Sequence, residues 1–432
     1  MTNEYRYQIG FGSFWQSEAL PNALPLNQNS PQKAPYGLYP EQLSGSAFTR
    51  PRTQNLRSWL YRILPSVVHS AFQPVIHDGI SFSPKAAMPT QMRWDPLPDP
   101  TEKTDFVQGL KTFLYNGSPE KHHGAAVLLY AANASMENTY FYNSDGDLLW
   151  VPYEGECTLV TEFGKLLLSP GEIAVIPRGI RFQVILHSPQ IKGYLLENYG
   201  LPFILPDLGP IGSNGLANPR DFLIPNAYFE EKEGDLLLLT KSNNQLWQAN
   251  LKSSPLNVVA WHGNYAPYKY ALSQFNTINT VSYDHPDPSI FTVLTSPGAH
   301  VGIANVDFVI FPERWMVAEN TFRPPYYHRN IMSEYMGLVF GEYDAKSQGF
   351  VPGGGSLHNC MSAHGPDGDT CEKAFEQTLS PKKVTNTLAF MFESSQPWIA
   401  TDFALNDTLL QKDYQSCWLN VKKHFDKNWL PS

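Results

Sequence analysis

Short β-prone runs separated by tight turns are the feature that most limits how this chain can fold. Between Glu137 and Ser188 each run is only a few residues long, and a Gly-containing pair follows most of them. Strands bounded by turn residues at regular spacing are typical of all-β sandwiches and barrels. The predicted strands are Tyr140–Tyr142, Asp147–Val151, Cys157–Glu162, Lys165–Leu168, Ile173–Ile176 and Phe182–Leu186.

The whole chain has a similar character. It contains 36 Pro and 30 Gly among 432 residues, with frequent Val, Ile and aromatic residues, so we predict a mostly β protein. A hydrophobic content of 42% is enough to bury a large core, and the length favours two domains. A polar, Pro-rich turn precedes an apolar strand between Val281 and Leu294, and we place the domain boundary near Asn276. The apolar spacing from Leu409 to Trp429 predicts a terminal helix.

The regular strands of the first half, together with the run Gly171–Gly179, resemble the double-stranded β-helix of cupins. A cupin would present metal-binding His around Asn143 to Asp147 and again near Phe182, where this chain has none. We therefore predict a large, cupin-like N-terminal β-sandwich domain, residues 1–275, that serves as a scaffold without metal. A smaller β-rich C-terminal domain, residues 276–432, would carry the chemistry.

Charge and apolar patterning exclude several classes of partner. The net charge of -9, the pI near 5.7 and the absence of a Lys/Arg run argue against nucleic-acid binding. Met1 to Gly10 lacks the apolar centre of a signal peptide, and no run approaches the ~18 apolar residues of a membrane span. We expect a soluble cytoplasmic protein that acts on a small molecule. The spacing of the four cysteines fits neither a disulfide scaffold nor a paired zinc site.

A cluster of possible metal ligands lies between Thr321 and Asp367. It contains His328, His358 and His364 together with Glu334. Two imidazoles and one carboxylate form the facial triad of non-haem Fe(II) oxygenases, which leaves three positions of the metal open. Any one of these His residues alone is more often structural, but the clustering favours a metal. Five of the twelve His fall within an eighty-residue span of the second half: His285, His300, His328, His358 and His364.

Zinc is the main competing metal. The His-Glu-x-x-His helix of zinc peptidases is absent, and Pro324-Pro325 opposes a helix through His328. This favours iron over zinc. His285 stands between Asp284 and Pro286, a setting that suits either a general base or an ordinary exposed turn. The nearby Tyr residues, including Tyr343, fit either a core or the wall of a pocket for a phenolic substrate.

Several long motifs in this region resemble the homogentisate 1,2-dioxygenase family, and the resemblance spans nearly the whole chain. The motifs that carry it are Thr321–Asn330, Met332–Glu334, Gly349–His358, His364–Asp367, Asn29–Tyr39, Leu60–Arg62 and Asp284–Leu294.

The resemblance implies an enzyme of tyrosine and phenylalanine breakdown that opens the ring of homogentisate with O₂ to give 4-maleylacetoacetate. It places the Fe(II) ligands on His328, Glu334 and His364 and the proton acceptor on His285. It places substrate contacts on Tyr343, His364 and His358. The resemblance also implies a homohexamer built as a dimer of trimers.

Two other classes of function stay open at this point. A cupin-like sugar isomerase or lyase would use a similar metal site but would turn over without consuming O₂. A binding or storage protein of cupin architecture would hold no metal.

Overall fold

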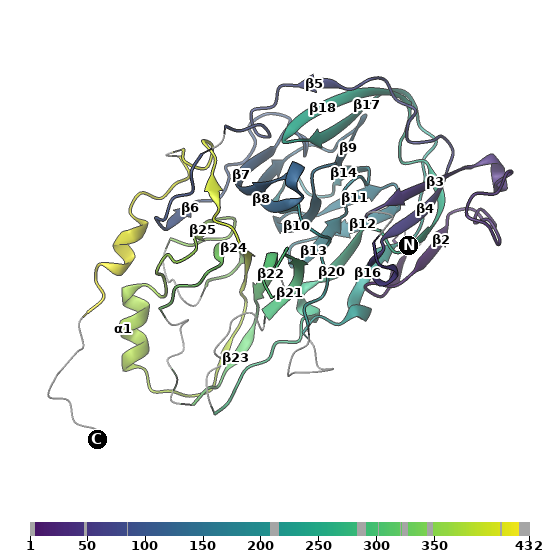
Figure 1. Ribbon diagram of the computed structural model, residues 1–432. Coiled ribbons are helices and arrows are strands. Elements are labelled where there is room, and N and C mark those ends of the chain that lie inside the picture. The colour runs from purple at the N-terminus through teal and green to yellow at the C-terminus, as the bar shows by residue number, and fades with distance from the viewer. Residues whose placement is uncertain are drawn as a thin grey trace.

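The computed structural model describes residues 5–46, 50–83, 85–207, 216–282, 291–300, 302–319, 321, 327–343, 349–406 and 408–422. These residues form sheets of nine, seven, six, four and two strands, so the mostly β prediction is confirmed (Figure 1). Their α-helix is α1 (Gly368–Glu376), and the 3-10 helices are Pro35–Gly37, Arg52–Gln54, Pro119–Lys121, Pro219–Asp221, Leu272–Gln274 and η8 (Tyr414–Trp418). None of the helices in these ranges is long and apolar enough to cross a membrane.

Two large sheets build the first half of the chain. The nine-stranded sheet has the order β1-β16-β20-β13-β10-β15-β8-β7-β28, and the seven-stranded sheet has the order β12-β11-β14-β9-β17-β18-β5. In the nine-stranded sheet the bounds are β1 Tyr7–Ile9, β7 Leu110–Ser118, β8 His123–Ala132, β10 Asp147–Glu154, β13 Glu172–Ile176, β15 Ile191–Asn198, β16 Phe222–Pro225, β20 Tyr268–Ala271 and β28 Ile399–Ala400. In the seven-stranded sheet they are β5 Gln73–Val75, β9 Thr139–Asn143, β11 Cys157–Thr161, β12 Gly164–Leu168, β14 Phe182–Leu186, β17 Glu233–Ser242 and β18 Gln245–Ser253.

Aromatic side chains fill the space between these two sheets. Trp150 on β10 lies 6.0 Å from Phe182 on β14, measured between ring centroids, and Phe106 stacks on Trp150 at 4.5 Å. All three are fully buried. Apolar residues that alternate along a strand place one face of each sheet in such a core, which explains why the short predicted runs here match β9 to β14 closely.

A four-stranded sheet, in the order β2-β19-β4-β3, lies on the side of the molecule farthest from α1 (Figure 1). It joins the N-terminal segment to the end of the first half. Its strands are β2 Trp15–Glu18, β3 Tyr39–Ser44, β4 Arg57–Arg62 and β19 Val258–Gly263.

The second half of the chain forms most of a six-stranded sheet with the order β21-β22-β27-β24-β25-β6. One edge strand, β6, comes from the first half, while β28 of the second half pairs with β7 in the nine-stranded sheet. The division at residue 276 stays a prediction. The strands are β6 Met92–Trp94, β21 Thr292–Pro297, β22 Ala304–Phe311, β24 Ser333–Phe340, β25 Gly355–His358 and β27 Leu388–Ser394, with β23 Arg314–Met316 and β26 Lys382–Val384 as a separate pair.

The predicted helix beginning at Leu409 is wrong for the residues that the structure describes. Leu409 to Gln411 instead run beside β6, where Leu410 bridges Trp94 and the Gln411 amide donates to the carbonyl of Arg93. Pairing with an existing strand outweighs the weak helical preference of the sequence, so only the 3-10 helix η8 forms before residue 423.

Candidate metal centre

Backbone pairing brings together three of the predicted site residues. Glu334 projects from β24, which lies between β27 and β25 in the six-stranded sheet. His328 and His364 form an isolated bridge, in which the amide of each donates to the carbonyl of the other at 2.9 and 3.1 Å. Residues far apart in the sequence thereby present their side chains to one place.

The three side chains converge closely. One ligand atom from each of His328, Glu334 and His364 lies within 4.8 Å of the others. Glu334 Oε1 is 3.5 Å from His328 Nε2, and Glu334 Oε2 is 3.0 Å from His364 Nε2. Glu334 and His364 are buried, while His328 is partly exposed. The structure therefore assembles the triad that the sequence analysis selected.

The hydrogen bonds of His364 indicate what this cluster can hold. Its Nδ1 lies 2.8 Å from the carbonyl oxygen of Ser362, which can only accept, so Nδ1 carries the proton. In a neutral imidazole Nε2 is then a bare acceptor, yet it faces the Glu334 carboxylate, which is also an acceptor. Two acceptors at this distance need a cation between them, either a proton or a metal ion. Fixing a metal-binding imidazole through its other nitrogen is the usual arrangement.

The carboxylate is prepared for the same role. Burial by itself raises the pKa of Glu334, but hydrogen bonds and charge attraction involving His328 and His364 outweigh it and hold the pKa at about 2. The side-chain amide of Asn330 donates to Oε1 of Glu334. The carboxylate is thus ionised at neutral pH and held in one orientation, as a metal ligand requires.

His358 lies against this triad. It ends β25 directly opposite Glu334 in the β24–β25 pairing. Its ring stacks on His364, with centroids 4.2 Å apart and planes 6° apart, and its Nε2 lies 2.8 Å from the hydroxyl of Tyr414. The predicted contact residue is therefore adjacent to the candidate metal position.

The other predicted site residues have different surroundings. Tyr343 is buried, and its ring packs 5.9 Å from that of Phe311 and 6.1 Å from that of Phe350. His285 lies outside the described residues. Sequence reasoning did not single out Asn330, Ser362 or Tyr414. Ser362 acts through its backbone carbonyl, which leaves no trace in the sequence.

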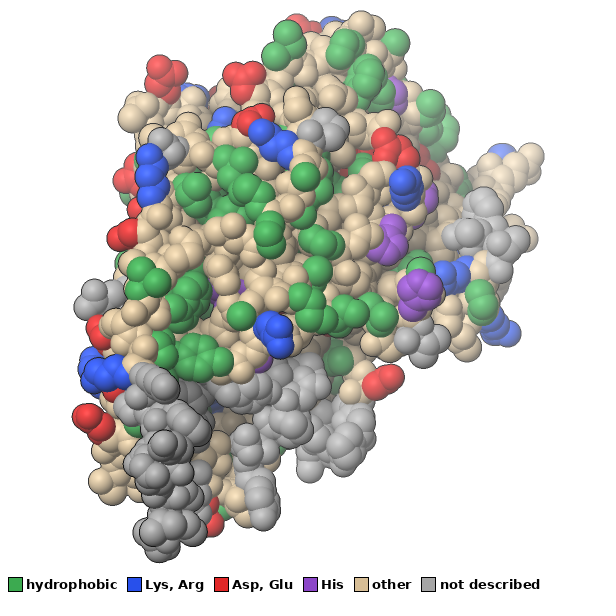
Figure 2. All heavy atoms as spheres, turned by 60° about the vertical axis from the view of Figure 1, so that its left-hand side comes forward, with side chains coloured by type: hydrophobic (Ala, Val, Ile, Leu, Met, Phe, Trp, Pro, Cys, Tyr) green, Lys and Arg blue, Asp and Glu red, His purple; other side chains and the backbone are tan. Residues whose placement is uncertain are grey.

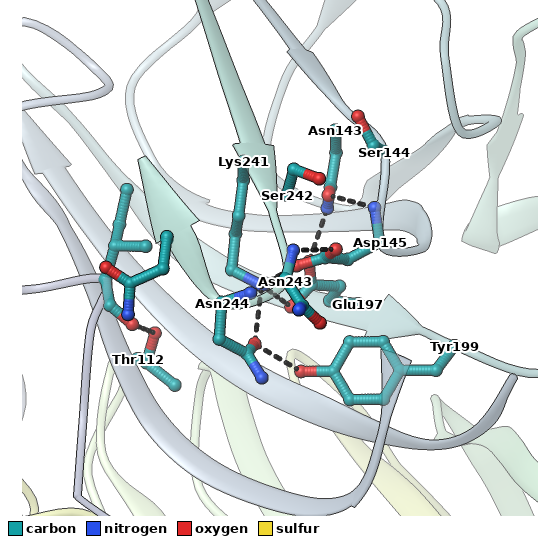
Figure 3. A network of polar contacts seen from close by, with 12 residues as sticks. Thr112, Asn143, Ser144, Asp145, Glu197, Tyr199, Lys241, Ser242, Asn243 and Asn244 are labelled. Carbon is teal, nitrogen blue, oxygen red and sulfur yellow. Dashed lines mark hydrogen bonds and ion pairs between the residues drawn. The ribbon is translucent and has the colours of Figure 1, made fainter. Parts of the chain in front are cut away.

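A second buried polar cluster lies in the first half of the chain, where the cupin comparison placed no metal (Figure 3). The ammonium of Lys241 contacts Asp145 Oδ2 at 2.9 Å, both oxygens of Glu197 at 2.8 and 2.9 Å, and Asn244 Oδ1 at 2.9 Å. Burial lowers the pKa of Lys241, but attraction to the two carboxylates outweighs this and raises it. The positive charge in this cluster therefore comes from a lysine side chain of the protein itself.

Comparison with known proteins relates nearly the whole chain to one family. Residues 6–272 match the N-terminal domain of homogentisate 1,2-dioxygenase, and residues 273–425 match its C-terminal domain. A protein of Pseudomonas fluorescens named homogentisate 1,2-dioxygenase is 57% identical over 422 residues, which cover 98% of this chain and 97% of the relative. The chain belongs to the homogentisate 1,2-dioxygenase family. It is an enzyme of this family, as the sequence motifs predicted.

Solved structures with some likeness to this member of the homogentisate 1,2-dioxygenase family include barrel proteins. Ylba from E. coli is 9% identical, with a TM-score of 0.31, and the match covers 72% of this chain and 95% of that one. A cupin 2 conserved barrel domain protein from Leptotrichia buccalis is 9% identical, with a TM-score of 0.26, covering 66% and 88%. With TM-scores this low, these structures give no information about the site of this protein.

Proposed function

We propose that this protein is a non-haem Fe(II) dioxygenase that opens the aromatic ring of homogentisate with O₂ and forms 4-maleylacetoacetate in tyrosine and phenylalanine catabolism. The observation that carries the proposal is the pair of acceptors, His364 Nε2 and Glu334 Oε2, that face each other at 3.0 Å in a chain of this family. A divalent cation satisfies both at once.

Two imidazoles and one carboxylate form the facial triad of non-haem Fe(II) oxygenases, so this donor set favours iron over zinc. Two neutral imidazoles and one carboxylate leave a divalent ion with a net charge of +1, which a singly ionised phenolic substrate neutralises. When bound, Fe(II) would bring O₂ and the phenolate of the substrate close together. His328, Glu334 and His364 would hold it, and Ser362 and Asn330 would fix the orientation of two of these ligands.

Substrate handling falls to residues beside this site. We assign contacts with homogentisate to Tyr343, His364 and His358, of which His358 already stacks against His364. His285, which is outside the described residues, is assigned as the acceptor of the phenol proton. Removing this proton makes the ring electron-rich and readier to react with O₂.

Oxygen uptake tests the proposal directly. The protein is first reconstituted with Fe(II) under anaerobic conditions. It should then consume O₂ when homogentisate and O₂ are supplied, and Glu334→Ala should not. Turnover of a sugar without O₂ uptake would instead identify an isomerase or lyase. Protein that binds homogentisate but retains no metal would identify a binding protein.

The role of His285 has its own test. His285→Asn should retain iron and bind homogentisate while kcat falls roughly 10²–10⁴-fold, the usual range for losing a positioned proton acceptor. The loss should be partly recovered at higher pH, where more of the substrate is already ionised. Normal turnover with a lowered melting temperature would mean that His285 only shapes its turn.

We also assign the protein to homohexamers built as dimers of trimers. Hydrophobic side chains gather in patches on the face shown in Figure 2, and such patches are typical of subunit contacts. Exposed apolar residues of the described chain include Phe14, Ile331, Phe375 and Leu419. Sedimentation velocity should give a hexamer; a monomer at all concentrations would contradict this.

A further inference from the structure

Tyr414 occupies an unusual position for a residue of a short 3-10 helix near the end of the chain. It is the first residue of η8 and is fully buried. The hydroxyl of a buried tyrosine usually has a hydrogen-bond partner. That partner is His358, whose Nε2 lies 2.8 Å away. The phenol thus places a polar group beside the candidate metal centre.

The ring of Tyr414 is held as firmly as its hydroxyl. The guanidinium carbon of Arg93 lies 4.5 Å from the ring centroid, and the Trp418 ring lies 5.0 Å away. Arg93 belongs to β6 and also donates to the side chain of Gln411. Contacts from two separate segments leave the phenol little freedom to turn.

His358 in turn contacts a proposed metal ligand, His364, and limits the movement of its ring. Its ring is nearly parallel to that of His364, with an angle of 6° and a centroid distance of 4.2 Å. The backbone carbonyl of Ser362 fixes Nδ1 of His364, and the stacked ring limits how far its plane can tilt. A continuous set of contacts therefore runs from Arg93 through Tyr414 and His358 to His364.

We propose that Tyr414 is a positioning residue of the metal centre: its hydroxyl orients His358, which in turn holds the His364 ring in its metal-binding position. This inference rests on the proposed function only in taking His364 as a metal ligand. It assigns a role to a residue 50 positions beyond that ligand in the sequence.

The decisive variant is Tyr414→Phe, which removes one oxygen and leaves the ring between Arg93 and Trp418. We expect Fe(II) or Co(II) to bind about 10-fold more weakly, within the range for losing a residue that supports a ligand. The dissociation constant is measured anaerobically by competition with a chromophoric chelator, so the readout does not depend on turnover. Metal affinity equal to that of the wild type would overturn the proposal.

Tyr61→Phe is the matched control. Tyr61 is also fully buried, and its hydroxyl also contacts an imidazole, Nε2 of His262 at 3.2 Å, but in the N-terminal half. Its removal should lower stability without changing metal affinity. Equal loss of metal affinity in both variants would mean a general effect of destabilisation and would reject the specific role of Tyr414.

A double-mutant cycle tests the route through His358. His358→Gln should weaken metal binding by a similar factor, and adding Tyr414→Phe to it should cause little further loss. Fully additive losses would show that Tyr414 does not act through His358. If the wild-type protein binds metal but does not oxidise homogentisate, the proposed substrate fails while the metal-affinity result still decides the role of Tyr414.

Discussion

Among the described residues, the buried cluster around Lys241 and the buried cluster around Glu334 compensate the charge of their carboxylates in different ways. In the N-terminal barrel, Asp145 and Glu197 surround the ammonium of Lys241, which supplies the positive charge from the chain itself (Figure 3). Around Glu334 the partners found among the described residues are His328, His364 and the amide of Asn330. Buried carboxylates need a compensating charge, and the second cluster obtains one from a metal ion in our proposal.

This difference supports the proposal that the N-terminal cluster belongs to a scaffold and the Glu334 cluster to a reaction site. A lysine cannot leave, so it stabilises the fold but offers no open position. Imidazoles hold a metal through lone pairs and leave part of its surface free for other molecules. The identity of the cation, more than the number of charges, separates the two regions.

The largest expected effect comes from breaking the proposed metal-binding cluster. His328→Ala, Glu334→Ala and His364→Ala should each fold, lose most bound iron and lose nearly all activity, because each removes one of three proposed protein ligands. Metal analysis and oxygen uptake measure this on one preparation. His262→Ala, which alters a His in the N-terminal half, is the control. Full activity in any of the three would remove that residue from the ligand set.

Breaking the N-terminal cluster should affect stability alone. Lys241→Met leaves Asp145 and Glu197 buried without their cation, and the free energy of unfolding should fall by about 3–5 kcal/mol. The folded fraction should keep its iron. Lys252→Met is the control, since its ion pair with Asp235 is exposed and should contribute little to stability.

Urea denaturation and metal analysis on the same sample check this contrast. Loss of iron from folded Lys241→Met protein would contradict the view that the two clusters act separately. A reproducible second metal bound by the wild-type barrel would contradict its role as a scaffold.

The smallest effect is expected at Asn330. Asn330→Ala removes the amide that donates to Glu334, so metal should bind about 10-fold more weakly with little change in melting temperature. Chelator competition gives the affinity. Asn133→Ala, which removes a similar amide that donates to backbone carbonyls in the N-terminal half, should leave affinity unchanged. An unaltered affinity in Asn330→Ala would limit the amide to a structural role.

The sequence predicted some features of this protein far better than others. Short strands such as those at Cys157 and Phe182 are bounded by local turn residues, so their positions follow from nearby sequence. The grouping of His328, Glu334 and His364 was predicted from residue type and motif. Their detailed geometry was not, because it depends on the bridge between two distant backbone segments.

Features that depend on distant pairing escaped prediction. The helix expected from Leu409 did not form because β6, more than three hundred residues earlier, supplies a backbone partner. The link between Tyr414 and His358 was missed for the same reason. Sequence periodicity describes what a segment prefers alone, while these residues respond to neighbours that only the fold supplies.

The exchange of edge strands between the two halves has a consequence for how the chain must be made. During synthesis on the ribosome, the nine-stranded sheet stays incomplete until β28 emerges, and β28 begins 281 residues after β7 ends. Until then the β7 edge is open to pairing with another nascent chain. Synthesis that stops before Ile399 would leave the first half exposed to aggregation, so premature termination late in translation should harm even the part already complete.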